Sequence, residues 1–207
     1  MERELLVFVK NPIAGKVKTR LAATIGKEKA LQVYNHLLEH TAKVCGEVNA
    51  RVSIYFSDEV PDRVSWHRDH FNYYPQKGHH LGERMENAFR EAFARGSREV
   101  VIIGSDLYDL SEAIIEEAFS LLQHHDAVIG PAKDGGYYLI GLHEIPKEVF
   151  GQKKWGSDTI LAATLTDLAP YDVVLLRELN DIDNFDDLKA YPDLLQLLNT
   201  TDHGTAT

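Results

Sequence analysis

The sequence predicts an α/β fold in which a mostly parallel sheet is flanked by helices. Short apolar runs alternate along the chain with longer segments whose apolar residues recur at helical spacing. Turn-type residues such as glycine, proline and aspartate follow most of the apolar runs, which is typical of buried strands. The 207-residue chain contains no internal repeat and no linker-like segment. We therefore expect a single domain over residues 1–199 and a disordered tail over residues 200–207.

The first half of the chain predicts three strands and two helices. The run "LLVFV" at residues 5–9 is continuously apolar, as expected for a strand buried on both faces. Residues 28–45 carry apolar side chains near helical spacing, and residues 51–56 ("RVSIYF") predict a second strand. A short third strand is expected near Asn72. The segment 81–96 places its apolar residues on one helical stripe and ends in a glycine, which commonly terminates helices.

The second half of the chain predicts four strands and two helices. An apolar run at residues 99–104 predicts a strand, and a helical pattern follows at residues 111–124. Residues 126–131 and 137–142 predict two strands, and the "AKDGG" link between them is typical of a hairpin. The last predicted elements are a strand over residues 172–176 and a helix that begins near Phe185.

A cluster of cations follows the first strand in the segment "KNPIAGKVKTRL", although the chain as a whole has a net charge of −10. Lysine and arginine neutralise phosphate groups, and Gly15 permits a close approach of the backbone to a ligand. The segment does not match a P-loop, and a solvated basic loop that leads into a helix is the alternative. The candidate phosphate-binding residues are Lys10, Pro12, Gly15, Lys16, Lys18 and Arg20.

Carboxylates follow two of the predicted strands. Asp106 comes just after residues 99–104, and such a group near bound phosphates suits Mg²⁺ or Mn²⁺, although a loop aspartate that bonds backbone amides is the alternative. Asp181 and Asp183 precede the last helix, where Asp183 is a candidate helix cap. Two neighbouring carboxylates repel each other unless a cation lies between them, which favours a metal site. Because ligands bind at the carboxyl ends of parallel strands, Asp106 and the basic turn are expected at one edge of the sheet.

The "AKDGG" link also has a functional interpretation. Asp134 is a polar group that would face a ligand, and Gly135 would leave room for a bulky substrate. The alternative is that Gly135 and Gly136 only permit a tight connection between two strands.

The composition argues against several functions. A net charge of −10 disfavours general binding to nucleic acid or to anionic membranes, because both require a cationic surface. No apolar run is long enough to span a bilayer, and the start of the chain does not resemble a signal peptide. The single cysteine, Cys45, lies among apolar helix positions and is interpreted as a core residue. We expect a cytoplasmic protein, and the sequence leaves its oligomeric state open.

Six segments occur in a characteristic order along the chain: "NPIAGKVKTRL", "LGERMENAF", "VVIIGSDLYDL", "AVIGPAKDGGYYLIGL", "WGSDTI" and "NDIDNFDDL". In this order they resemble a family of small bacterial nucleotide-diphospho-sugar transferases of the GT-A glycosyltransferase type, which is related to small nucleotidyltransferases. The resemblance implies a three-layer, Rossmann-like GT-A fold with a mostly parallel mixed sheet. It also implies a nucleotide diphosphate held together with a divalent cation, Mg²⁺ or Mn²⁺.

The resemblance also implies roles for individual residues. Gly15, Lys16, Lys18 and Arg20 match the phosphate-binding turn, and Asp106 matches the metal-binding acid after the central strand. Asp183 matches a second metal ligand, with Asp181 beside it, and Asp134 is the candidate catalytic acid or base together with Asp106. The implied sugar or acceptor side consists of Gly135, Gly136 and Tyr137, with Asp134 beside them. The sequence departs from the family pattern at Tyr108, where a proline is usual, and at Asn184–Phe185, where a Thr-Pro pair is usual.

The resemblance favours a metal-dependent glycosyltransferase that moves a sugar from a nucleotide-diphospho-sugar to a small acceptor. Two alternatives use the same residues. The first is a nucleotidyltransferase that joins an NTP to a phosphorylated metabolite and releases pyrophosphate. The second is a nucleotide-binding module without catalysis. The sequence does not specify the base, the sugar, the acceptor or the stereochemical outcome.

Overall fold

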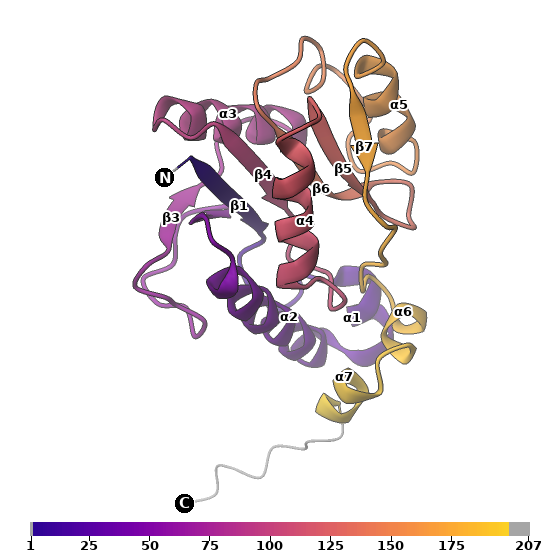
Figure 1. Cartoon of the computed structure of the whole chain (residues 1–207). Coiled ribbons are helices and arrows are strands. Elements are labelled where there is room, and N and C mark those ends of the chain that lie inside the picture. Colours follow the sequence, from indigo (N-terminus) through magenta and orange to yellow (C-terminus); the bar gives the residue numbers. More distant parts are fainter. Residues whose placement is uncertain (1, 199–207) are drawn as a thin grey trace, which may run out of the picture.

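In the computed structural model, which describes residues 2–198, seven strands form one twisted sheet in the order β3-β2-β1-β4-β6-β5-β7 (Figure 1). Apolar residues dominate β1 and β4, which occupy the centre of the sheet and are buried on both faces. The strands are β1 (Arg3–Val9), β2 (Arg51–Phe56), β3 (Asn72–Pro75), β4 (Glu99–Ile103), β5 (Ala127–Pro131), β6 (Tyr137–Leu142) and β7 (Val173–Leu175).

The sheet is mostly parallel, and β6 is the strand that makes it mixed. β6 runs antiparallel to both of its neighbours, β4 and β5, whereas β1 is parallel to β2 and β4, and β5 is parallel to β7. The short turn at residues 132–136 explains this direction, because a parallel connection needs a crossover of about a dozen residues or more. The predicted mostly parallel mixed sheet and the predicted hairpin are both confirmed.

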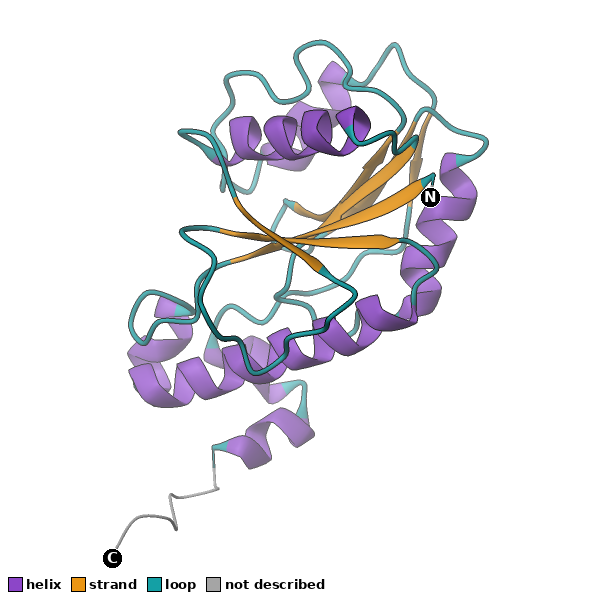
Figure 2. Ribbon diagram, turned by 90° about the vertical axis from the view of Figure 1, so that its left-hand side faces the viewer, coloured by secondary structure: helices purple, strands orange, loops and turns teal. Residues whose placement is uncertain are grey.

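Helices cover both faces of the sheet and give three layers (Figure 2). One face packs against α2 and α4, whose buried residues share a core cluster with β1 and β2. The other face packs against α3 and α5. The helices are α1 (Thr19–Ile25), α2 (Lys27–Glu47), α3 (Leu81–Ala94), α4 (Glu112–Leu122), α5 (Ile160–Asp167), α6 (Phe185–Lys189) and α7 (Pro192–Leu197).

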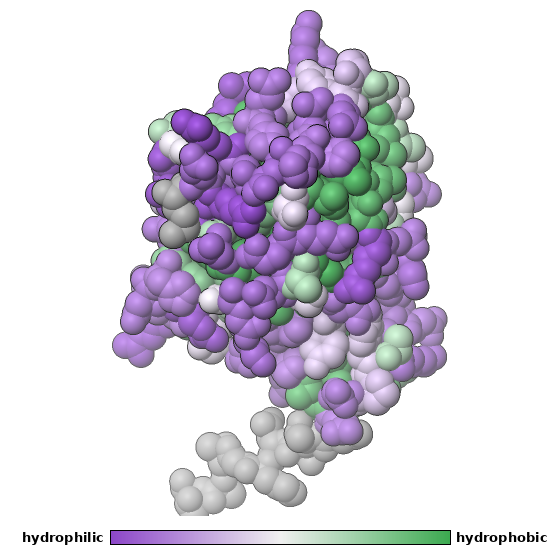
Figure 3. Space-filling model, in the orientation of Figure 1, coloured by the Kyte–Doolittle hydropathy of each residue, from purple (hydrophilic) through white to green (hydrophobic). Residues whose placement is uncertain are grey.

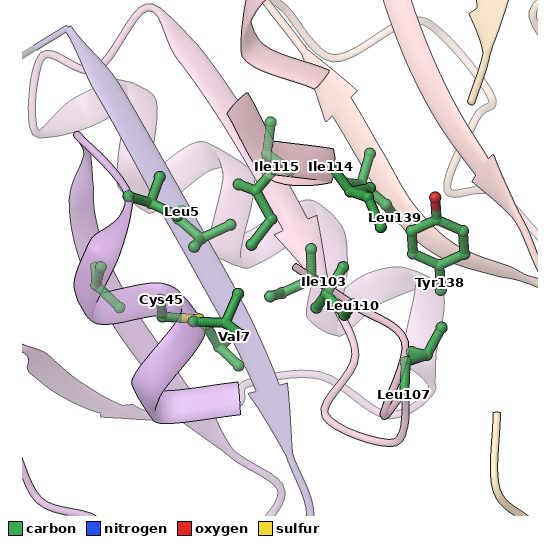
Figure 4. Packing of buried hydrophobic residues seen from close by; sticks show 14 of the residues in the cluster. Leu5, Val7, Cys45, Ile103, Leu107, Leu110, Ile114, Ile115, Tyr138 and Leu139 are labelled. Carbon is green, nitrogen blue, oxygen red and sulfur yellow. The ribbon is translucent and has the colours of Figure 1, made fainter. Parts of the chain in front are cut away.

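The core anchors the loop that follows β4. Leu107 and Leu110 lie in this loop and are buried in the same core cluster as Ile103 of β4 and Ile114 and Ile115 of α4 (Figure 4). Burial of one leucine contributes about 1.5–3 kcal/mol, so two buried leucines hold the loop against the sheet. Asp106 immediately precedes Leu107, and the loop therefore presents this carboxylate at a defined position.

The structure adds helices that the hydrophobic pattern does not predict. α1 follows the basic turn directly, and α5 lies in a segment for which no helix is predicted. The last predicted helix is two short helices, because Pro192 cannot donate the backbone hydrogen bond of a continuous helix. The predicted disordered tail at residues 200–207 lies outside the described residues. Within residues 2–198, no helix is both long and apolar enough to cross a bilayer.

The surface is hydrophilic over most of the face seen in Figure 1. Figure 3 shows a hydrophobic area on this face, in the region of β5 and β7. Leu175 in the edge strand β7 is 48% exposed. Single exposed leucines are common on protein surfaces.

Candidate active site

The candidate site lies where β1 and β4 end. The two strands are parallel neighbours, with Val7 opposite Ile103, so the chain leaves both at the same edge of the sheet. The Tyr34 hydroxyl of α2 accepts a hydrogen bond from the Lys10 amide at 2.9 Å and donates one to the Lys10 carbonyl at 3.1 Å. It also lies 3.3 Å from the Ser105 hydroxyl, and it thereby connects the loops after β1 and β4.

Lys18 lies at the centre of the site. Its Nζ is 3.1 Å from Asp106 Oδ2 and 3.2 Å from Asp183 Oδ1, and its side chain is only 3% exposed. Burial lowers the pKa of Lys18, but the charges of Asp106 and Asp183 and the hydrogen bonds to them outweigh this effect and raise it above its ordinary value. Lys18 also has a left-handed backbone conformation (φ 47°), which costs a non-glycine residue about 1–2 kcal/mol. Such strain is typical of functional sites.

The segment after β7 brings Asp183 to this edge of the sheet. The Ile182 amide donates a 3.1 Å hydrogen bond to the Asp106 carbonyl, and α6 lies beside α1 (Figure 1). The cap of α6 is Asn184, whose side chain accepts hydrogen bonds from the amides of Asp186 and Asp187. The prediction of Asp183 as the cap is therefore wrong. Because Asn184 takes this role, the Asp183 carboxylate is available to Lys18.

The departures from the family pattern also have structural roles. Asn184 forms a capping box with Asp187, whose Oδ2 accepts hydrogen bonds from the amides of Asp183 and Asn184 at 3.0 Å each. Tyr108 packs its ring against His40 of α2 and edge-on against Tyr191, with ring centroids 4.9 and 5.5 Å apart. Side-chain contacts thus define the loop shapes that proline would otherwise constrain.

The other cations of the basic turn are exposed around Lys18. Arg20 is 75% exposed, and its guanidinium lies 3.6 Å from Asp183 Oδ2. Lys10 and Lys16 are exposed and line the same pocket, which has a volume of about 230 Å³. The structure therefore brings the predicted cations and two of the predicted acids into one pocket. Its charged lining residues are Lys10, Lys16, Lys18, Arg20, Asp106 and Asp183.

A third carboxylate, Asp181, lies near Asp183 and Lys18 without lining this pocket. Burial, followed by the charges of Asp183 and Asp134, raises the pKa of Asp181 from 3.8 to about 6, against the opposing effects of a backbone hydrogen bond and the charge of Lys18. Asp181 is therefore close enough to be repelled by both Asp183 and Asp134. Asp134 itself is exposed in the turn between β5 and β6, where its Oδ1 accepts a 2.8 Å hydrogen bond from the Gly136 amide.

Two of the predicted glycines, Gly15 and Gly135, allow backbone conformations that other residues rarely adopt. Gly15 has φ +77°, and a Cβ there would face the Lys27 side chain, while neither Gly15 nor Pro12 lines the pocket of the cations. Gly135 has φ +86°, and a Cβ there would lie 2.0 Å from the Asp158 carbonyl oxygen. The space at Gly135 is thus occupied by the chain itself. Gly136 and Tyr137 instead line a separate, apolar cavity.

Two further cavities continue along the same edge. Sequence reasoning indicated Asp134, Gly136 and Tyr137, which line the apolar one, but not the other residues of the two cavities. A cavity of about 500 Å³ shares Lys10, Tyr34 and Asp106 with the pocket of the cations and extends to Gln76 and Arg84. In the wall of this cavity, Arg84 donates hydrogen bonds to the carbonyls of Gly78 and Ser57 and so connects these two loops. An apolar cavity of about 210 Å³ follows, and Phe8, Leu81 and Gly104 line both. The "LGERMENAF" segment contains Leu81 and Arg84, and it was the part of the sequence that could have indicated these cavities.

The acid pair meets the basic requirement of a divalent cation site. No group of three or more histidine, cysteine, aspartate or glutamate side chains forms a metal site among residues 2–198. However, Asp106 and Asp183 both point an oxygen at one cation, the ammonium of Lys18. Mg²⁺ in phosphate-binding sites is typically held by one or two carboxylates, with substrate oxygens and water completing its coordination. Two converging carboxylates beside a cationic pocket fit this pattern, provided that Lys18 gives up its position.

Solved structures with the same architecture define the class of the protein. A protein from Desulfovibrio desulfuricans G20, provisionally named a nucleotide-diphospho-sugar transferase, is 32% identical, with a TM-score of 0.85 over 96% of this chain and 94% of the other. Two others share the fold at 12% identity. They are 4-diphosphocytidyl-2C-methyl-D-erythritol synthase from Anaerococcus prevotii DSM 20548 (TM-score 0.62, 94% and 96% covered) and Rv0371c from Mycobacterium tuberculosis H37Rv complexed with manganese (TM-score 0.52, 97% and 100% covered). The chain is an α/β transferase with the nucleotide-diphospho-sugar transferase fold.

The family follows from the sequence. Residues 40–157 match the family model described as "uncharacterized protein conserved in bacteria" (DUF2064). The chain belongs to this family, and together with the 32% identical structure the match confirms the family that the six segments indicate. No curated protein matches the chain.

Proposed function

We propose that the protein transfers a sugar from a nucleotide-diphospho-sugar to a small acceptor with the help of Mg²⁺ or Mn²⁺. The observation that supports this proposal is the convergence of Lys10, Lys16, Lys18 and Arg20 with the carboxylates of Asp106 and Asp183 in one pocket. A diphosphate and its metal ion need both kinds of group at the same place. An acidic protein that concentrates four cations in one pocket fits an anionic ligand there.

In this proposal the carboxylates of the pocket bind the metal ion, and its basic residues bind the phosphates. Asp106 and Asp183 would hold the divalent cation, which supplies charge stabilisation for the departing diphosphate when bound. Lys18 would then exchange its two carboxylates for phosphate oxygens, whose negative charge would keep the buried ammonium protonated as Asp106 and Asp183 do without ligand. Lys16 and Arg20 are exposed beside it and neutralise the remaining phosphate charge.

The transfer itself needs a proton acceptor near the incoming hydroxyl. The acceptor oxygen bonds to the anomeric carbon, and the bond from that carbon to the phosphate oxygen breaks. The electron pair of this bond leaves with the nucleoside diphosphate, and the hydroxyl proton passes to a base. Asp134 fits this role because it is exposed, lines the apolar cavity and lies near Asp181.

Nucleotidyl transfer is the second candidate, favoured by the likeness of the fold to a diphosphocytidyl synthase. The same cations would bind the phosphates of an NTP, and the products would be a nucleotidyl metabolite and pyrophosphate. The two reactions are separated by their products. Release of a nucleoside diphosphate from nucleotide-sugars supports glycosyl transfer, and release of pyrophosphate from NTPs with sugar or acid phosphates supports nucleotidyl transfer. Binding with no turnover indicates a non-catalytic module.

The test of the pocket is Asp106→Asn, compared with Asp109→Asn in the same loop. Asp109 accepts a hydrogen bond from Tyr191 and does not line the pocket. Thermal unfolding is measured with a panel of nucleotides and nucleotide-sugars, each with Mn²⁺ and with EDTA. We expect metal-dependent stabilisation in the wild type and in Asp109→Asn. In Asp106→Asn we expect its loss, with turnover at least about 100-fold lower, because even residues that only orient metal ligands change function 10–100-fold. Unchanged metal-dependent stabilisation of Asp106→Asn would contradict the proposal.

A further inference from the structure

The apolar cavity that Asp134 lines has no ligand assigned to it by the proposed reaction. Its volume is about 210 Å³, and it lies between β1, β4 and β6 of the sheet and the helices α3 and α5. Among the described residues that line it, only Asp134 is charged. Its apolar walls come from Phe8, Leu81, Met85, Ile102, Trp155 and Ile160.

We propose that this cavity binds the apolar, uncharged part of the acceptor and that the acceptor is a neutral alcohol carrying an aromatic ring or a short alkyl chain. The inference rests on the proposed function, because it assigns the acceptor subsite of that same reaction. The reacting hydroxyl would lie at the mouth of the cavity beside Asp134, and the apolar part would lie inside.

The charge of the lining excludes a phosphorylated acceptor from this cavity. An anionic group would meet the carboxylate of Asp134 and no lysine, arginine or histidine among the described lining residues. The cations of the site lie instead in the pocket around Lys18. A donor sugar also fits poorly, because its hydroxyl groups would lose water and gain few hydrogen-bond partners from apolar walls. An apolar group has neither difficulty.

The size of the cavity limits the ligand. An apolar cavity of about 150 Å³ accommodates benzene. A cavity of about 210 Å³ therefore accommodates one substituted ring or an alkyl chain of similar volume. Small-molecule sites in general combine apolar walls with a few polar groups that orient the ligand, and Asp134 with Ser157 provides those groups here.

Trp155 forms a wall of the cavity that is held in place before any ligand binds. Its indole lies so close to α3 that a Cβ on Gly82 would be 2.3 Å from the ring atoms. The His80 ring is stacked on the indole, with ring centroids 6.4 Å apart. The indole Nε1 of Trp155 donates a 3.3 Å hydrogen bond to the Gly151 carbonyl. A fixed aromatic wall reduces the entropy lost when a flat ligand binds. It also makes Trp155 a fluorescent reporter of the cavity.

The test uses benzyl alcohol, glycerol and glycerol 3-phosphate as probes of the full-length protein. We expect a saturable change of tryptophan fluorescence with benzyl alcohol, absent with glycerol and glycerol 3-phosphate and absent in Trp155→Phe. Leu81 is 43% exposed at the cavity, so Leu81→Lys should leave the fold intact and weaken benzyl alcohol binding at least fivefold. The matched control is Leu175→Lys, at a similarly exposed leucine that does not line the cavity, and it should bind like the wild type.

The same preparations separate failure of this inference from failure of the proposed function. Nucleotide-sugars are tested with Mn²⁺ by thermal unfolding, and transfer is measured with benzyl alcohol and with glycerol 3-phosphate as acceptors. If nucleotides bind, any one of three results overturns the inference. These are no saturable benzyl alcohol signal, equal effects of Leu81→Lys and Leu175→Lys on benzyl alcohol binding, and transfer only to glycerol 3-phosphate. Benzyl alcohol binding that depends on Leu81, without binding of any nucleotide, overturns the proposed function and leaves an apolar ligand site.

Discussion

Replacing Asp181 by asparagine should stabilise the protein at neutral and alkaline pH. The folded state raises the pKa of this carboxyl from 3.8 to about 6, because it is partly buried and lies near Asp183 and Asp134. A change of this size corresponds to about 3 kcal/mol at about 1.36 kcal/mol per pKa unit. The side chain is partly exposed and solvent screens its interactions, so we expect about 1 kcal/mol. For a chain of this length that is an increase in melting temperature of about 2–4 °C.

The pH dependence follows from the sign of the pKa change. Below pH 3.8 the carboxyl is protonated in both the folded and the unfolded state, and it does not affect stability. As the pH rises from 3.8 to about 6, the unfolded state loses this proton first, so the folded state becomes relatively less stable. The full cost is present above about pH 6, and the asparagine variant is free of it.

The assay is urea unfolding of the wild type and Asp181→Asn in EDTA at pH 4.5 and pH 8. The expected result is a variant that is more stable by about 1 kcal/mol at pH 8, with a clearly smaller difference at pH 4.5. Asp62→Asn, an exposed aspartate in the loop after β2, is the control and should show neither effect. A variant that is no more stable than the wild type at pH 8, or a gain of equal size at both pH values, would refute the reasoning. A confirmed gain would mean that the neighbouring acids reduce the stability of the folded state.

Two further substitutions test how the site is held. Asn184→Ala removes the cap of α6 and should lower the free energy of unfolding by about 1 kcal/mol, measured by urea unfolding, whereas an unchanged value would contradict the capping role. Gly135→Ala should cost more than Gly96→Ala. Both glycines have a positive φ (86° and 90°), which costs alanine about 1–2 kcal/mol, but an added Cβ at Gly135 would meet the Asp158 carbonyl oxygen, whereas at Gly96 it would meet nothing within 4 Å. Equal destabilisation of the two glycine variants would show that this close contact is relaxed without cost.

The sequence predicts most of the secondary structure because the information is local. The continuous apolar runs of β1 and β4 indicate buried strands, and the helical periodicity of α2 and α3 is long enough to be recognised. The cations of the basic turn and Asp106 are recognisable from their position after a strand. α1 and α5 are harder, because each is short and buries only one or two residues. Their stability comes from packing against the rest of the chain, which the local pattern does not contain.

The sequence by itself determined the alternation of strands and helices, the concentration of cations after the first strand and the presence of acids after two later strands. Only the tertiary structure decided that Lys18 lies between Asp106 and Asp183, that Asn184 rather than Asp183 caps α6, and that Asp134 lines an apolar cavity at the same edge of the sheet. The physical reason is distance along the chain. Periodicity and capping preferences act over a few residues, whereas Lys18 and Asp183 are 165 positions apart and meet only because parallel strands end at one edge of the sheet.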